Sequence, residues 1–487
     1  MYKIVFTLKQ HTPLIHFQHD QAGATLRATE VKPKLDRFII EEITKLNGDK
    51  AKEKFLFCTT KKIKSGKVLI DNPDFNQNWY NLLLDPDNDH LAFDYKLAIY
   101  ANDQFITKLK SKENWDGVQN PVYFANMGDS APKHYSEAKS IDFTIRTFNK
   151  GIHDLFSENF ICKFFLYNNF GSRHTKGLGS FYPEMINTKK IISQPYELLP
   201  KEVHYIEIAS TKDYDIFATI DFFWKWLKSG INYNGYYKDS ILKLFISSKE
   251  KYKWEKRKVK EHYLGLAPDS DLKYFIRAYM GLADNFTYKW VPKRKRRSGE
   301  VYTPIDITIN IECQDNEVQR NSAPFLFVPF KENKNTKIFI IYQPSFHDKL
   351  DNKTFRLTIK KIEPVKVIVN IDKSHNKSKE ITKRIFPDLN NAHNILKEAK
   401  AYLENIDDRK IKQKAVDLIE KANDFVEYFE LNTANNLTLI KTINTSPVAP
   451  KLSGLLEFAF SNIGSTFDVK DFSGTNLIKA NFLKNGK

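Results

Sequence analysis

Apolar and polar positions alternate in several short segments of the chain, which is the pattern of half-buried β-strands. These segments are residues 2–8, 91–99, 141–148, 203–209, 305–311, 325–330, 336–342 and 354–360. Elsewhere apolar residues recur every three or four positions and therefore share one face of a helix. This spacing predicts helices near residues 35–46, 152–168 and 216–228, and long helices over 391–431. Strands and helices in this order predict an α+β fold.

Several prolines lie close together in residues 183–203 and indicate a domain boundary there. We therefore predict a first domain over residues 1–190 and a second over residues 203–487, with a helical elaboration around 391–431. The first domain contains, in order, a strand, a helix, two strands, a helix, a glycine-rich loop at 171–181 and a strand. That order is compatible with a ferredoxin-like sandwich.

The composition is that of a globular protein long enough for two to four domains, because 41% of its 487 residues are hydrophobic and 14% are aromatic. The formal net charge is +17 and the isoelectric point is about 9.3. A positive charge of this size indicates a polyanionic partner, most often nucleic acid. A lysine-rich composition that follows from an AT-rich genome is the alternative explanation.

Cysteine is rare in the chain. Cys58, Cys162 and Cys313 are far apart, so they form no CxxC metal pair and indicate no disulfide framework. The first residues enter a strand pattern directly, without the features of a signal peptide. No apolar stretch is long enough to span a membrane. We therefore expect a cytoplasmic protein without a membrane partner, and we expect no bound metal or other cofactor.

The glycine-rich loop after the predicted helix 152–168 is the most informative local feature. It combines three glycines with side chains that can carry positive charge: Gly171, Arg173, His174, Lys176, Gly177 and Gly179. Successive N–H groups in such a turn can form an anion-binding concavity, and the cationic side chains add charge for phosphate. The loop is neither a Walker loop nor a dinucleotide fingerprint, since it precedes a strand and not a helix. Either it holds a phosphodiester backbone or it is a glycine-rich connection with solvated charges.

The polar segment after the first strand contains a group of possible catalytic residues, namely His11, His16, His19 and Asp20. A histidine with a pKa near neutrality can act as general base against a ribose 2′-hydroxyl. Four such residues within a short segment can also hold a metal. Histidine and aspartate are common in polar surface loops without any chemistry, and we adopt that interpretation.

Two basic segments lie farther along the chain. Residues 249–260 combine seven Lys and Arg residues with Tyr252 and Trp254, and residues 293–297 read KRKRR. The aromatic rings either stack on nucleic-acid bases or face the core from an amphipathic helix.

Three segments together resemble the RAMP superfamily of CRISPR effector subunits. The first is Thr12-Pro13-Leu14 followed by residues 23–38, GATLRATEVKPKLDRF, which is similar to the superfamily's entry into its first helix. The second is the glycine-rich loop, which is similar to the GxRxxxGxG signature. The third joins residues 277–282, RAYMGL, to residues 319–327, QRNSAPFLF, and is similar to part of a second RAMP domain.

The combination resembles the large two-domain subunit that caps the 3′ end of the guide RNA (crRNA) in type III-B (Cmr) complexes. The resemblance implies two ferredoxin-like (RRM-like) RAMP domains with helical insertions and a helical C-terminal region. Gly464 and Gly474 are candidates for a glycine loop in the second domain. The implied RNA-binding residues lie near the first helix and in the glycine-rich loop: Arg27, Lys32, Lys34, Arg37, Gly171, Arg173, His174, Lys176, Gly177 and Gly179. A helix N-terminus also favours phosphate, whereas a solvated basic face is the alternative for the first four residues.

The resemblance therefore implies a non-catalytic RNA-binding subunit of a type III CRISPR ribonucleoprotein effector in antiviral defence. It would contact the 3′ region of the crRNA and the paired target RNA, with other RAMP subunits as its protein partners. The alternative is a RAMP-type endoribonuclease, which would process crRNA with His16 or His19 or cleave target RNA with Asp20.

Overall fold

The structure is a computed structural model that describes residues 1–15, 25–47, 92–108, 134–233, 236–249, 253–254, 273–281, 285–290, 305–314, 323–343, 350–362, 441–444, 452–470 and 477–485. The chain divides into two compact units. Unit 1 comprises Met1–Ile241, Phe325–Gln343 and Ser453–Lys487, and unit 2 comprises Leu242–Pro324 and Pro344–Leu452. The domain boundary predicted between residues 190 and 203 stays a prediction.

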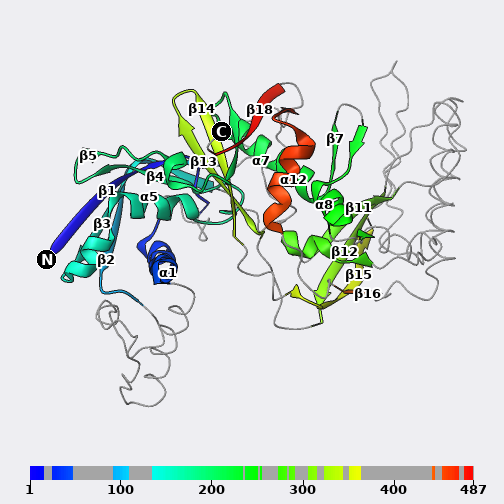
Figure 1. The fold of residues 1–487 in the computed structure, drawn as a ribbon, viewed down its shortest axis with the longest axis horizontal. Helices are drawn as coiled ribbons and strands as arrows, with labels where there is room; N and C mark the ends of the chain where they lie inside the picture. Colours follow the sequence, from blue (N-terminus) through cyan, green and yellow to red (C-terminus); the bar gives the residue numbers. More distant parts are fainter. Residues whose placement is uncertain are drawn as a thin grey trace, which may run out of the picture. The chain divides into compact units, whose positions relative to one another are not determined.

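The first sheet of unit 1 has five antiparallel strands in the order β2-β3-β1-β4-β5 (Figure 1). Its elements are β1 (Tyr2–Gln10), α1 (Ala28–Asn47), β2 (Lys96–Lys108), β3 (His134–Thr147), α4 (Lys150–Leu155), α5 (Glu158–Tyr167), β4 (Phe181–Ile186) and β5 (Lys189–Lys190), followed by α6 (Pro195–Leu198). The strand predicted at 2–8 is confirmed as β1. The strands predicted at 91–99 and 141–148 are observed as β2 and β3, whose bounds lie several residues away.

One face of the first sheet carries the core and the other faces outward. Ile4, Phe6 and Leu8 alternate along β1 and are fully buried. Phe6 packs edge-on against Phe143 of β3, which packs in turn against Phe165 of α5. Helix α4 contacts β1 and β3, and α5 contacts β4. Because side chains alternate between the two faces of a strand, the intervening residues of β1, β2 and β3 lie on the opposite face, where they are exposed or half-buried.

The single helix predicted over residues 152–168 is wrong, because this segment forms two helices, α4 and α5. Asn149 precedes α4, and its Oδ1 accepts the Gly151 N–H at 2.8 Å. Ser157 lies between the two helices, and its Oγ accepts the Phe160 N–H at 3.3 Å. A serine in this position satisfies a backbone donor that has no partner inside the helix. The chain therefore begins a new helix at Ser157 instead of extending α4.

The second sheet of unit 1 has five antiparallel strands in the order β13-β14-β6-β18-β17. Its elements are β6 (His204–Ile208), α7 (Asp213–Lys228), β13 (Phe325–Glu332), β14 (Asn335–Tyr342), the 3-10 helix η5 (Leu452–Gly454), α12 (Leu455–Ile463), β17 (Thr466–Lys470) and β18 (Leu477–Lys484). A small hairpin, β7 (Ile231–Tyr233) and β8 (Tyr236–Lys238), follows α7. The strands predicted at 203–209, 325–330 and 336–342 and the helix predicted at 216–228 are confirmed.

The part of the second sheet formed by β13 and β14 is buried on both faces, whereas β17 and β18 alternate buried and exposed residues. On one face, Phe482 of β18 packs against Phe223 of α7 and Phe460 of α12. On the other, Leu326 and Phe339 join the hydrophobic core of the first sheet. A strand that is covered on both sides reads as a continuous apolar run, and β13 begins with such a run. The two sheets of unit 1 therefore share one core.

Unit 2, taken by itself, contains a four-stranded antiparallel sheet in the order β11-β12-β15-β16. Its elements are α8 (Ile241–Lys249, whose first residue belongs to unit 1), β9 (Lys253–Trp254), β10 (Lys273–Tyr274), the 3-10 helix η3 (Ile276–Met280), β11 (Asn285–Trp290), β12 (Ile305–Cys313), β15 (Thr354–Ile362) and β16 (Lys441–Asn444). The strands predicted at 305–311 and 354–360 are confirmed as β12 and β15. The helices predicted over 391–431, the run 293–297 and most of 249–260 lie outside the described residues. None of the helices within the described ranges is long and apolar enough to cross a membrane.

Candidate nucleic-acid interface

The glycine-rich loop joins α5 to β4 through backbone that favours glycine. The angle φ is +75° at Gly171, +87° at Gly177 and +65° at Gly179, and it is also positive, at +56°, at Arg173. A Cβ atom added at Gly179 would lie 2.0 Å from the Phe170 carbonyl oxygen. At Gly171 and Gly177 the added atom would also come within 3 Å of protein atoms. These glycines therefore allow the loop to approach the rest of unit 1 closely.

Many of the loop N–H groups that a phosphate-binding concavity would use already donate within the protein. Their acceptors are Glu30 Oε1 for Gly171 (2.6 Å), Ile15 O for Ser172 (2.7 Å), Arg173 O for Lys176 (2.9 Å), His174 O for Gly177 (3.2 Å) and Pro13 O for Gly179 (2.9 Å). The Glu30 carboxylate takes the position at Gly171 that a bound anion would occupy. These five N–H groups therefore stabilise the loop and are not free to bind phosphate, so affinity for phosphate depends mainly on its side chains.

The loop covers the outer edge of β13, which is an edge strand of the second sheet. The Phe327 N–H donates to Thr175 O at 3.1 Å, and Asn169 Nδ2 donates to Phe327 O at 2.7 Å. Ser180 Oγ donates to Pro329 O at 2.8 Å. Proline has no N–H and is tolerated at a strand edge. An uncovered edge invites pairing with other chains, so the glycine-rich loop is also a structural junction between the two sheets.

Three of the four basic residues expected at the start of the first helix lie farther inside it. The helix begins at Ala28, so Lys32, Lys34 and Arg37 lie beyond its first turn. The favourable effect of a helix N-terminus on phosphate is confined to that turn, and the argument fails for these three residues. Only Arg27 lies directly before the helix.

Lys32 and Lys34 form ion pairs with carboxylates of their own helix. Lys32 Nζ lies 3.1 Å from Asp36 Oδ2, and the Tyr95 hydroxyl donates to the same carboxylate at 2.8 Å. Burial raises the pKa of Asp36, and the Lys32 charge opposes that rise. Lys34 Nζ lies 3.5 Å from Glu30 Oε1. Both lysines therefore offset buried negative charge, and their contribution to an external phosphate site is reduced.

A cationic cluster forms where the loop meets helix α7, from Arg173 and Lys176 of the loop and Lys225 of the helix. Burial lowers the pKa of Lys176, the Arg173 and Lys225 charges lower it further, and the Asp221 charge opposes them. Asp221 is also the ion-pair partner of Lys225. The charges of Arg173 and Lys225 thus act on Lys176 together with that of Asp221, and an incoming anion would add favourable negative charge to this cluster. Lys225 was missed in the sequence, where it is only a basic residue in the last turn of a predicted helix.

His174 supports the loop and adds little charge. Its Nδ1 lies 3.2 Å from the Gly171 carbonyl oxygen, to which it can donate. Burial and the nearby Lys34 charge lower the pKa of His174, so the ring is neutral near pH 7.

The candidate nuclease residues His16, His19 and Asp20 lie outside the described residues. His11 is described and only 1% exposed. Its Nδ1 accepts the Lys331 N–H at 2.8 Å, and its ring lies 4.5 Å from the Phe330 ring, centroid to centroid. Burial holds the pKa of His11 well below its usual value. No substrate can reach His11 in this position, and within the described residues no group of three or more His, Cys, Asp and Glu side chains is arranged to hold a metal.

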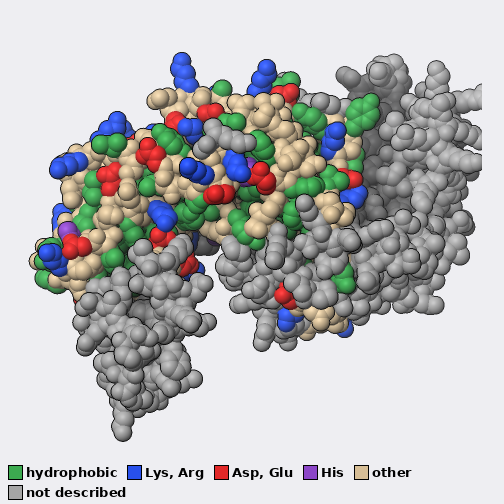
Figure 2. Space-filling view, in the orientation of Figure 1, with side chains coloured by type: hydrophobic (Ala, Val, Ile, Leu, Met, Phe, Trp, Pro, Cys, Tyr) green, Lys and Arg blue, Asp and Glu red, His purple; other side chains and the backbone are tan. Residues whose placement is uncertain are grey.

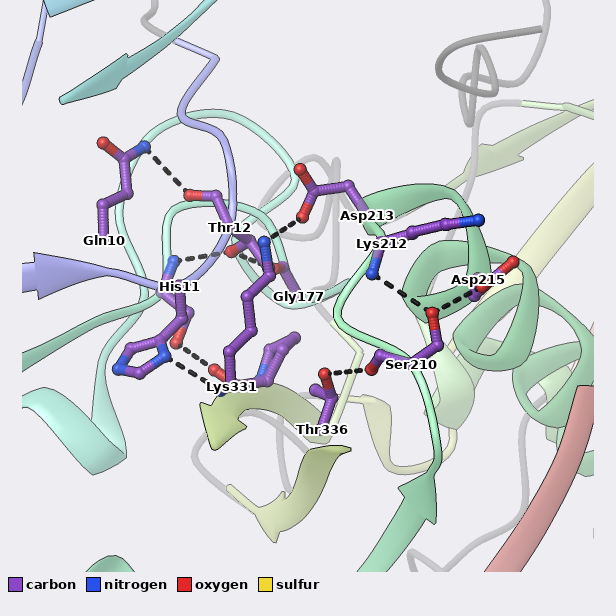
Figure 3. A network of polar contacts seen from close by, with 12 residues as sticks. Gln10, His11, Thr12, Gly177, Ser210, Lys212, Asp213, Asp215, Lys331 and Thr336 are labelled. Carbon is purple, nitrogen blue, oxygen red and sulfur yellow. Dashed lines mark hydrogen bonds and ion pairs between the residues drawn. The ribbon is translucent and has the colours of Figure 1, made fainter. Parts of the chain in front are cut away.

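Beside His11, Lys331 and Asp213 form an ion pair at the junction of the two sheets (Figure 3). Lys331 Nζ of β13 lies 2.8 Å from Asp213 Oδ1 in the first turn of α7. Glu137 of β3 lies close to Asp213, and each carboxyl group affects the pKa of the other. Burial, and then the Asp213 charge, raise the pKa of Glu137 to about 7. We call His11, Glu137, Asp213 and Lys331 the junction network.

The junction network predicts a pH-dependent stability. Because the pKa of Glu137 is raised from 4.5 to about 7, the folded state binds this proton more tightly than the unfolded state. Stability should therefore be lost as the pH rises from about 4.5 through about 7. We expect Glu137→Gln to reduce the difference in unfolding free energy between about pH 5 and pH 8 by about 1–2 kcal/mol, a figure discounted for partial exposure. Chemical denaturation at both pH values measures this. The exposed Glu202→Gln is the control, and an equal pH dependence in both variants would contradict the prediction.

On the face drawn in Figure 2, positive charge does not gather in one large patch. On the face drawn in Figure 2, Lys and Arg side chains are spread out with Asp and Glu side chains between them. On this face, a nucleic-acid interface would depend on local groups of cations and not on one large patch.

Comparison with known proteins gives a family match for the N-terminal part of the chain. Residues 1–231 match the family model described as the Cmr1 N-terminal domain. This range includes the first sheet, the glycine-rich loop, β6 and α7. Among solved structures, the chain is similar to Cmr1 from Pyrococcus furiosus in its apo form, at 10% identity and a TM-score of 0.32, over 79% of this chain and 94% of that chain. A TM-score this low supports no argument about the fold. The curated proteins contain no match.

Proposed function

The chain is a Cmr1-like protein of the RAMP superfamily with its Cmr1 N-terminal domain at residues 1–231, and from that premise we propose that it is a non-catalytic RNA-binding subunit of a type III CRISPR effector. In this role it contacts the 3′ region of the crRNA and the paired target RNA, beside other RAMP subunits, in antiviral defence. Phosphate contacts position RNA without selecting its sequence, so its sequence preference is weak.

The topology of both sheets supports the ferredoxin-like part of the proposal. The first sheet has the element order β1, α1, β2, β3, α4 with α5, and β4, which is the βαββαβ order of that fold. The second sheet repeats it with β6, α7, β13, β14, α12 and β18. In both, the first strand of the set lies between the third and the last. The segments that form unit 2 are insertions into the second set.

The observation that carries the RNA-binding proposal is the meeting of Arg173, Lys176 and Lys225 beside the glycine-rich loop. Arg173 and Lys176 lie in the loop between α5 and β4, and Lys225 lies in α7, which follows the first strand of the second sheet. The junction hydrogen bonds from the loop to β13 hold the cluster in place. Phosphate oxygens are strong acceptors for such cations.

The double substitution Arg173→Ala with Lys176→Ala tests the proposal. We expect affinity for a short labelled single-stranded RNA to fall about fivefold to tenfold at low salt, with a loss of about 1.4 in the slope of log K against log salt, because each phosphate contact in a single strand contributes about 0.7. Fluorescence anisotropy across a KCl series measures both quantities.

The matched control removes the same charge elsewhere, with Lys201→Ala and Lys212→Ala. Both lysines are exposed and lie outside the loop. Equal affinity of the loop variant and the wild type would refute the assignment of the loop. Recovery of intact RNA after incubation with the wild type is the expected result of the non-catalytic role, and cleaved RNA would contradict that role.

A further inference from the structure

We infer that the outward face of the first sheet is a second RNA-binding surface, where a row of three cations, Lys3, Arg146 and Lys96, crosses adjacent strands and binds the backbone of a single strand. The inference rests on the proposed RNA-binding function. It concerns a surface that is separate from the glycine-rich loop.

The strand register places the three cations side by side. Lys3 of β1 pairs with Arg146 of β3, and Arg146 pairs on its other side with Lys96 of β2. Neighbouring strands are about 4.8 Å apart, so the row extends about 10 Å across the sheet. We call these three residues the cation row.

The cation row is exposed and lacks local compensation. All three side chains are exposed. Among the residues that the structure describes, no acidic side chain forms an ion pair with any of them. Like charges directly opposite one another destabilise a sheet. A polyanion lying across the row would remove that repulsion, which makes phosphate a better match to this face than an uncharged partner.

The surroundings of the cation row suit a nucleic-acid strand. The next row consists of the small or neutral residues Val5, Thr144 and Ala98. Tyr100, which is 69% exposed, lies four residues beyond Lys96 on the same side of β2. Phe148, which is 80% exposed, lies two residues beyond Arg146. Exposed aromatic rings beside cations bind single strands by stacking on the bases. Two described carboxylates lie near this face. Asp142, which is paired with Tyr100, accepts a hydrogen bond from the Thr7 hydroxyl, and Asp94 lies two residues before Lys96.

The triple substitution Lys3→Ala, Lys96→Ala and Arg146→Ala tests the inference on the full chain with a short labelled oligouridine. We expect affinity to fall at least about tenfold at low salt and the salt slope to decrease by about 2. The midpoint of thermal unfolding should not fall, because the substitutions remove exposed and mutually repelling charges. The control is Lys201→Ala, Lys212→Ala and Lys238→Ala, which removes the same charge from exposed positions outside the first sheet.

A separate substitution, Tyr100→Ala, tests stacking. It should lower affinity about tenfold while the salt slope stays the same. The exposed Tyr236→Ala, in β8, is its control.

The outcomes separate this inference from the proposed function. If the loop variant Arg173→Ala with Lys176→Ala loses affinity while the cation-row variant binds like the wild type, the second surface is refuted and the proposed function stands. Such a result would leave the face to an acidic protein partner. If the wild type binds no RNA, both are refuted. The second surface is supported if the cation-row variant loses affinity and its slope of log K against log salt decreases, whether or not the loop variant changes in the same way.

Discussion

Replacing Gly179 with alanine is expected to lower the free energy of unfolding by about 3–5 kcal/mol, the sum of a strained positive φ and a steric overlap. The added Cβ would lie 2.0 Å from the Phe170 carbonyl oxygen and 2.9 Å from its carbonyl carbon. Both atoms belong to the backbone, so no side-chain rotation relieves the contact. The loop must then shift, together with its hydrogen bonds to β13. Denaturant unfolding followed by tryptophan fluorescence measures the loss.

Gly464→Ala is the matched control for this effect. Gly464 has a similar φ of +86°, and an added Cβ there meets no atom within 4 Å. The Gly464→Ala variant should therefore lose only the free energy of holding alanine at a positive φ, about 1–3 kcal/mol. If the two variants lose the same unfolding free energy, the close packing of the loop around Gly179 does not contribute to stability, and the prediction is wrong.

Lys331→Met is expected to have the other large effect, through the junction network. The side chains of Lys331 and Asp213 are only 23% and 16% exposed. Removing the lysine leaves the Asp213 and Glu137 carboxyl groups together without their cation. Loss of one partner of a buried ion pair costs about 3–5 kcal/mol. We expect a loss of this size near pH 8 and a smaller one near pH 5, because burial raises the pKa of both carboxyl groups and they take up protons as the pH falls.

Chemical denaturation of the Lys331→Met variant at the two pH values measures the effect. Lys9→Met provides a surface comparison, because Lys9 pairs with Glu184 at 3.4 Å with side chains 41% and 53% exposed. A pair of this kind contributes less than about 1 kcal/mol. Adding Asp213→Asn to Lys331→Met should restore part of the stability near pH 8. Equal losses at both pH values and no restoration would show that lost packing, and not charge, explains the result.

The local pattern of apolar and polar residues was sufficient to predict most strands and helices among the described residues. The alternating residues of β1 and the apolar run of β13 predicted strands because each element buries a regular set of side chains. The prediction failed where a single polar residue decided the outcome, as at Ser157, whose side chain begins a new helix in the middle of an apolar segment.

The candidate site was only partly accessible to sequence reasoning. The glycine spacing correctly marked a loop with positive φ, but it did not reveal that the N–H groups donate to Glu30, Ile15 and Pro13. Those acceptors come from other parts of the chain. The basic residues of α1 were singled out for their charge, although Lys32 and Lys34 offset carboxylates one turn away.

The sequence by itself determined the basic character of the protein, most of its N-terminal strands and helices, and the position of the glycine-rich loop, because these depend on residue type and short-range spacing. Only the tertiary structure decided which charges meet. Lys225 joins Arg173 and Lys176 because α7 packs beside the loop, and Lys3, Arg146 and Lys96 form a row because β3 pairs with β1 on one side and β2 on the other. The physical reason is that electrostatic interactions depend on distance in space, and strand pairing and core packing set that distance between residues far apart along the chain.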